Sequence, residues 1–236
     1  MKTHPTSNKK TARKAGLLYL SIVITGIFSL MYVPSKLIIW DNAAATFNNV
    51  IVQESLFRFG IVSGLLCYTC FLFLPLVLYR LLSPVNENYA KFMVLLAAVS
   101  VPMFFINAQN QFNILSLVNN DIKISSVEET QSQVLLYFNQ YNNGLRLIHI
   151  FSGLWLFPFG YLVFKSDFLP KVLGILLILG CFGYLINFLG NTLFPMYSKL
   201  GVSTYVSLPA SIGEIGICLW FLIVGVKEKN ARKTEF

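Results

Sequence analysis

The fold of this chain is decided by the stretch LFRFGIVSGLLCYTCFLFLPLVL at residues 56–78, which carries no charged side chain after Arg58. A helix needs about 20 apolar residues to cross the hydrocarbon core of a bilayer, and this stretch is long enough. Only helices and closed barrels satisfy the backbone in lipid, and barrel strands alternate polar with apolar residues. Because no such alternation occurs here, we predict a transmembrane helix.

Comparable apolar stretches recur along the chain, at residues 15–33, 92–114, 145–164, 172–189 and 207–226. The 236 residues are 56% hydrophobic and only 12% charged, whereas soluble domains carry about 25% charged residues. The mean hydropathy is +0.66. We therefore predict an all-α transmembrane helix bundle of about six spans. It forms a single domain over residues 1–236, with basic tails at 1–14 and 227–236.

Basic residues set the orientation of such a bundle, since cytoplasmic loops are enriched in lysine and arginine. With the N-terminus in the cytoplasm, most of the 18 basic residues fall in the tails and inner loops. An even number of spans then returns the C-terminus to the cytoplasm. The net charge of +8 is explained by this bias, so no nucleic-acid partner is predicted.

The sequence offers no metal or cofactor site. Cys67 and Cys70 lie within a predicted span and lack the second cysteine pair or nearby histidine of a zinc site. His149 is one of only two histidines, so a histidine-based metal site lacks further ligands. No Walker A, dinucleotide-binding or G-x-S-x-G motif occurs. We therefore predict neither a metal nor a cofactor.

Two outer loops are expected to contain helices of their own. The later part of the first loop, residues 34–55, mixes apolar and polar side chains and predicts a helix at the membrane interface. In the second loop, SVEE at 126–129 fits a capping box and predicts a short amphipathic helix. Asn142-Asn143-Gly144 is expected to separate this helix from the span at 145–164.

Six stretches carry a resemblance to a known family: ARKAGLLYL (12–20), DNAAAT (41–46), ESLFRFGI (54–61), LYRLLSPVN (78–86), IFSGLWLFPFGYLVFKSDFLPKVLG (150–174) and GEIGICLW (213–220). With these motifs, the chain resembles an uncharacterised bacterial membrane-protein family, domain of unknown function 4386, over nearly its whole length. The resemblance implies a multi-pass protein of the bacterial cytoplasmic (inner) membrane. It implies no reaction, ligand or catalytic residue.

Polar residues within the predicted spans are the candidates for function, because ionisable groups in hydrocarbon are expensive. Glu54 and Arg58 are four residues apart, so we predict that they pair on one helical face. Under the predicted orientation, the polar residues within the spans fall in the outer half of the membrane, which indicates a polar pocket beneath the outer surface. The ligand-binding candidates are Glu54, Arg58, Asn107, Asn110, Arg146, His149 and Glu214.

Three interpretations of this set are open. In the first, Arg58 and Arg146 bind a phosphate or carboxylate group of a ligand, since guanidinium groups offer planar donors. In the second, Glu54 and Glu214 neutralise the two arginines in a structural network. In the third, the arginine side chains simply extend toward the outer headgroups.

The function that we predict first is the binding or passage of a small anionic or amphipathic ligand. An intramembrane lipid-modifying enzyme would use His149, Ser152 and Glu214. An accessory subunit would pack against another membrane protein through small residues such as Gly153 and Gly160. The sequence leaves the question of enzyme activity open. The expected partners are the lipid bilayer and a small-molecule or lipid ligand.

Overall fold

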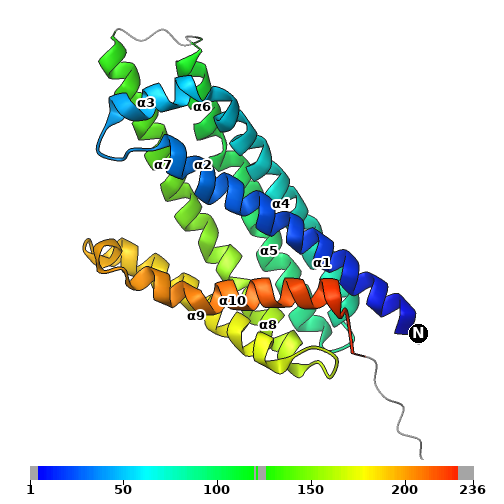
Figure 1. Cartoon of the computed structure of the whole chain (residues 1–236). Helices are drawn as coiled ribbons and strands as arrows, with labels where there is room; N and C mark the ends of the chain where they lie inside the picture. Colours follow the sequence, from blue (N-terminus) through cyan, green and yellow to red (C-terminus); the bar gives the residue numbers. More distant parts are fainter. Residues whose placement is uncertain (1–4, 120, 122–125, 228–236) are drawn as a thin grey trace, which may run out of the picture. The chain divides into compact units, whose positions relative to one another are not determined.

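The computed structural model describes residues 5–119, 121 and 126–227, and the regular secondary structure in these ranges is helical (Figure 1). The ends of both predicted basic tails lie outside the described residues. Two short elements, the π-helical turn η1 and the 3₁₀ turn η2, interrupt the series of α-helices. The elements are α1 (Pro5–Ile27), η1 (Phe28–Tyr32), α2 (Val33–Leu37), α3 (Ala43–Val52), α4 (Glu54–Leu82), α5 (Glu87–Asn107), α6 (Gln109–Val118), α7 (Val127–Leu154), α8 (Leu156–Lys165), α9 (Lys171–Leu193), η2 (Tyr197–Leu200) and α10 (Val202–Ile223).

Six helical segments of the described chain are long and apolar enough to cross a membrane. This confirms the predicted all-α architecture with six spans, and the protein is a multi-pass membrane protein. Three of the segments combine consecutive helical elements: α1 continues through η1 into α2, α5 continues into α6, and α7 continues into α8. The segments are Asn8–Leu37, Glu54–Leu82, Glu87–Val118, Val127–Lys165, Lys171–Leu193 and Val202–Ile223.

Contacts between residues divide the chain into two compact units. The first unit contains the described residues of Met1–Leu20, Leu72–Ala98 and Ile150–Phe236, and therefore includes α8, α9 and α10. The second unit contains Ser21–Phe71 and the described residues of Val99–His149, and includes α2, α3 and α6.

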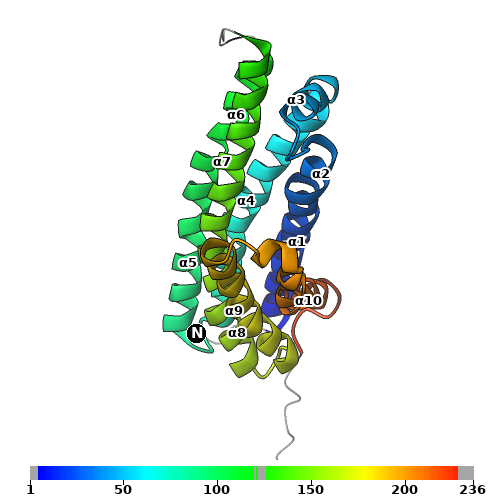
Figure 2. The same cartoon turned by 90° about the vertical axis from the view of Figure 1, so that its left-hand side faces the viewer.

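The predicted helix in the first loop is present as α3, in the second unit. The side chain of Asn42 caps it, because Asn42 Oδ1 accepts a hydrogen bond of 2.9 Å from the backbone N–H of Ala45. Thr46 is fully buried, and its hydroxyl bonds both the N–H and the carbonyl of Ile39, at 2.9 and 3.0 Å. These contacts fold the loop back, so that α3 packs on α2 and α6 (Figure 2).

The predicted capping serine is also found. Ser126 Oγ accepts a hydrogen bond of 3.1 Å from the N–H of Glu129 at the start of α7. The predicted break after this helix is wrong, however, because α7 runs without interruption from Val127 to Leu154.

Gly144 is in the middle of α7 for a packing reason. Asn107, at the end of α5, donates from Nδ2 to the backbone carbonyl of Tyr141 at 2.9 Å. A Cβ atom at position 144 would overlap the Asn107 side chain, so only glycine admits this contact. The glycine therefore marks a close approach between helices and not a helix end.

In the first unit, α9 packs closely on α8 and α10 through glycines. Gly160 of α8 and Gly174 of α9 face each other, since a Cβ on either would lie 2.6–2.7 Å from the backbone of the opposite helix. A Cβ atom on Gly183 of α9 would likewise overlap the carbonyl oxygen of Val206 in α10. These approaches leave little room for α9 to rotate, so its polar side chains are held in place.

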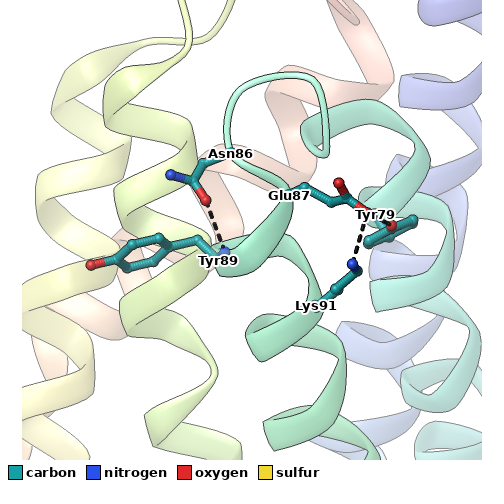
Figure 3. A network of polar contacts seen from close by, with 5 residues as sticks. All are labelled: Tyr79, Asn86, Glu87, Tyr89 and Lys91. Carbon is teal, nitrogen blue, oxygen red and sulfur yellow. Dashed lines mark hydrogen bonds and ion pairs between the residues drawn. The ribbon is translucent and has the colours of Figure 1, made fainter.

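The turn between α4 and α5 is short, and polar contacts fix it (Figure 3). Asn86 Oδ1 accepts a hydrogen bond of 3.1 Å from the N–H of Tyr89 and so caps α5. Glu87 Oε1 lies 2.8 Å from Lys91 Nζ and 3.3 Å from the hydroxyl of Tyr79, which donates to it. These groups are exposed, so the contacts order the turn and add little stability.

Candidate functional site

Glu214 of α10 is held by two tyrosines from two other helices of the first unit. The hydroxyl of Tyr19, on α1, donates to Glu214 Oε2 at 3.0 Å. The hydroxyl of Tyr184, on α9, donates to Glu214 Oε1 at 3.4 Å. Both carboxyl oxygens therefore have a neutral donor, and no lysine or arginine among the described residues forms an ion pair with Glu214.

Close helix packing brings these three side chains together. Gly16 of α1 lies against Leu222 of α10, where a Cβ atom would be 2.9 Å from the Leu222 backbone nitrogen. Cys218 Sγ also lies 3.7 Å from the carbonyl of Gly16. On the other side of α10, a Cβ on Gly180 of α9 would lie 2.7 Å from the Cα of Ala210. Small residues thus place Tyr19 and Tyr184 within reach of α10.

Aromatic side chains pack beside Tyr19. The ring of Trp155 is almost fully buried and lies 6.4 Å from the Tyr19 ring, centroid to centroid. Trp155 stacks on Phe159 at 5.1 Å. The tryptophan lies where α7 ends and α8 begins, a break that Pro158 favours because it has no N–H for the carbonyl of Leu154.

A second polar cluster lies between α9 and α10. Asn187 Nδ2 donates to Ser207 Oγ at 2.8 Å and to the carbonyl of Ser203 at 3.2 Å. Asn187 Oδ1 accepts from the hydroxyl of Tyr197 at 2.7 Å. Asn187 follows Tyr184 by three residues, so the two side chains share one face of α9. We call the set Tyr184, Asn187, Tyr197, Ser203, Ser207 and Glu214 the polar seam.

Comparison with known proteins identifies the family. A family model described as "Domain of unknown function (DUF4386)" matches residues 14–225. The chain belongs to the DUF4386 family. The match confirms the resemblance seen in the sequence, and it covers every residue of the polar seam.

This DUF4386 protein is 34% identical over 83 residues to a curated relative, an uncharacterised protein of the archaeon Archaeoglobus fulgidus. The matched region is 35% of this chain and 47% of the relative, so the chain spans about half the length of the protein it matches. No solved structure matches the chain.

Of the seven ligand-binding candidates predicted from the sequence of this DUF4386 protein, Glu54 and Arg58 pair on one face of α4, in the second unit. Glu54 Oε1 lies 2.6 Å from Arg58 Nη2 and 2.8 Å from Arg58 Nε. The Arg58 side chain is 51% exposed. The pair is therefore local to one helix, and it already neutralises the Arg58 charge.

Asn107 and Asn110 contact each other at the end of α5 and the start of α6. Asn110 Nδ2 donates to the carbonyl of Asn107 at 3.0 Å and lies 3.2 Å from Asn107 Oδ1. Because Asn107 Nδ2 is bound to Tyr141, these amides satisfy each other and the backbone. Their contacts explain helix packing in the second unit without a ligand.

Arg146 and His149 lie on the second-unit part of α7. Arg146 is exposed, and the described residues provide no carboxylate that pairs with it. His149 is half-buried. The seven candidates thus divide between the units, with Glu214 in the first and the other six in the second.

The tyrosines that bind Glu214 were absent from the sequence-based set. Tyr19 and Tyr184 lie inside apolar spans, and a buried tyrosine hydroxyl usually has a hydrogen-bond partner. That rule would have flagged both residues, although it does not name the partner. The described residues contain no group of histidine, cysteine and acidic side chains that could hold a metal ion.

Proposed function

We propose that this DUF4386 protein binds a small amphipathic molecule within the membrane, and that Glu214 binds either a proton or the polar head of that molecule. The proposal is supported by the clamp of two tyrosine hydroxyls on the Glu214 carboxyl group. An acidic side chain within a span is costly and is most often retained for function. We also propose the bacterial cytoplasmic membrane as its location, with both termini in the cytoplasm.

The chemistry of the clamp suits reversible protonation. Ionised carboxylate accepts hydrogen bonds only, whereas protonated carboxylic acid also donates one. A tyrosine hydroxyl both donates and accepts, so Tyr19 and Tyr184 can serve either form of Glu214 by rotating their hydroxyl hydrogens. A lysine or arginine partner would instead bind the ionised form alone.

The same chemistry indicates the type of ligand head. Both tyrosines meet the carboxyl group as donors, so a head group that donates hydrogen bonds, such as an amine, can take their place. Arg58 is already paired with Glu54, and this weakens the case for the anionic head group predicted from the sequence. Arg146 remains the candidate contact for an anion, in the second unit.

The two alternative functions have less support. Ser152 Oγ is buried, and no described residue hydrogen-bonds it, so it lacks the adjacent base that activates a serine nucleophile. In the accessory-subunit hypothesis, Gly153 and Gly160 pack against another membrane protein. Instead α9 of the same chain covers them, through Tyr184 and Ile178.

Three amphipathic probes with the same chain length test this proposal on the purified protein in lipid nanodiscs. Dodecylamine, dodecanoate and dodecanol differ only in the head group, and binding is measured over a range of pH. We expect dodecylamine to bind best and to lose affinity as the pH falls, because protons compete for Glu214. Glu214→Gln should bind it about tenfold more weakly or worse, without this pH dependence. Preference for dodecanoate in both proteins would contradict the proposal.

A further inference from the structure

The second unit contains a small cavity of about 20 Å³ beside the π-helical turn η1. Most of its lining is apolar and includes Leu37, Phe57 and Phe138. Three polar side chains also line it, one each from η1, α6 and α7: Ser29, Gln111 and Tyr141. The cavity therefore lies where five helical elements of this unit meet, namely η1, α2, α4, α6 and α7.

Ser29 is the most informative of the three. Its residue is only 4% exposed, and Ser29 Oγ hydrogen-bonds no protein atom among the described residues. A hydroxyl removed from water without a new partner destabilises a folded protein, so native structures rarely retain one. Its position on the wall of a cavity indicates that its partner is a small molecule.

The backbone places Ser29 in this position. The N–H of Val33 bonds the carbonyl of Phe28, five residues back, which widens the helix by one residue over η1. Pro34 follows directly and lacks an N–H, so the regular α-helical pattern cannot be restored at that turn. Such π-helical turns often occur at functional sites.

Gln111 and Tyr141 supply the other polar groups. Both residues are buried, and both of them line the cavity. A hydroxyl, an amide and a phenol together offer donors and acceptors in neutral form. No charged side chain of the described residues lines the cavity, which argues against a metal cation or an anion as the occupant.

The size of the cavity decides which neutral ligand it can hold. A water molecule needs a cavity of about 10–15 Å³ and two to four polar partners, and this site offers both. The cavity is too small for the head group of an amphipathic ligand. We infer that it binds one water molecule, which bridges Ser29 Oγ to the side chains of Gln111 and Tyr141. The water then joins η1 to α6 and α7 and completes the hydrogen bonding of the widened turn.

The first test is an experimental structure of the full chain at a resolution that shows ordered water. We expect a density peak within hydrogen-bonding distance of Ser29 Oγ and of Gln111 or Tyr141, and its loss in Ser29→Ala. A cavity without density in the wild-type protein overturns the inference.

Unfolding temperatures give an independent second test. If the water is present, Ser29→Ala loses a hydrogen bond and unfolds at a lower temperature than the wild type. If the cavity is dry, the same change removes an unsatisfied hydroxyl and raises that temperature, which overturns the inference. Ser63→Ala is the matched control, since Ser63 Oγ bonds the carbonyl of Thr25 directly at 3.1 Å and Ser63→Ala should lower the unfolding temperature in either case.

Discussion

The hydroxyl of Tyr19 lies 3.0 Å from Glu214 Oε2, although 195 residues separate the two in the chain. This hydrogen bond joins the first and last membrane-crossing segments of the described chain. It gives an acidic group within a span a neutral partner in place of a cation. The proposed exchange of a proton or ligand at Glu214 rests on this arrangement.

Removal of either tyrosine hydroxyl should destabilise the protein. We expect Tyr19→Phe to lower the free energy of unfolding by about 1–3 kcal/mol, because it leaves one Glu214 oxygen without its donor. Tyr184→Phe should have a smaller effect, since its hydrogen bond is longer, at 3.4 Å. Denaturant titration in mixed micelles measures both values.

Tyr205→Phe is the control for this pair, because Tyr205 is 75% exposed on α10 and should tolerate the loss of its hydroxyl. Equal stability of all three variants would show that the clamp contributes nothing.

The spans were predictable because hydropathy over some 20 residues depends only on local sequence. The pairing of Glu54 with Arg58 was predictable for the same reason, since residues four apart on a helix are neighbours. The break expected at residues 142–144 was wrong, because the role of Gly144 depends on Asn107, which is distant in sequence. The tyrosine partners of Glu214 likewise come from helices whose packing no local pattern specifies.

Gly144 provides a test of that packing. Alanine usually stabilises the interior of a helix relative to glycine by about 1 kcal/mol. We expect Gly144→Ala to destabilise the protein by about 1–3 kcal/mol instead, because its methyl group would overlap the Asn107 side chain. The measured change in the free energy of unfolding should therefore have the opposite sign to the change expected from helix propensity.

Gly26→Ala is the matched change for this test. A Cβ atom there would lie 3.4 Å from Cys67 Sγ, which is close to ordinary contact, so the variant should be neutral or more stable than the wild type. A stabilising Gly144→Ala would refute the proposed close approach.

Asn187 should contribute more to stability than its neighbour Asn191. Asn187→Ala removes the partner of Tyr197, Ser203 and Ser207. We expect it to lower the free energy of unfolding by about 1–3 kcal/mol. Among the described residues, the Asn191 side chain bonds only the carbonyl of Asn187 on its own helix, so Asn191→Ala should lower the free energy of unfolding by less. Similar losses for both variants would contradict a central role of Asn187 in the polar seam.

The Glu54–Arg58 pair should be weak. Both side chains are partly exposed and belong to one helix, so a double-mutant cycle with Glu54→Gln and Arg58→Gln should give a coupling energy of only about 0.3–0.5 kcal/mol. Binding of dodecylamine should be unchanged in both variants. A coupling of several kcal/mol would instead place this pair in a buried structural network.

The most direct test of the central claim is infrared difference spectroscopy of the purified protein in lipid as the pH is changed. The wild-type protein should show a carbonyl band of a protonated carboxylic acid that grows as the pH falls. This band should be absent from Glu214→Gln and shifted in Tyr19→Phe, which removes one hydrogen bond to the group. If Glu214→Gln retains every band of the wild type, Glu214 does not exchange a proton and the proposed function is wrong.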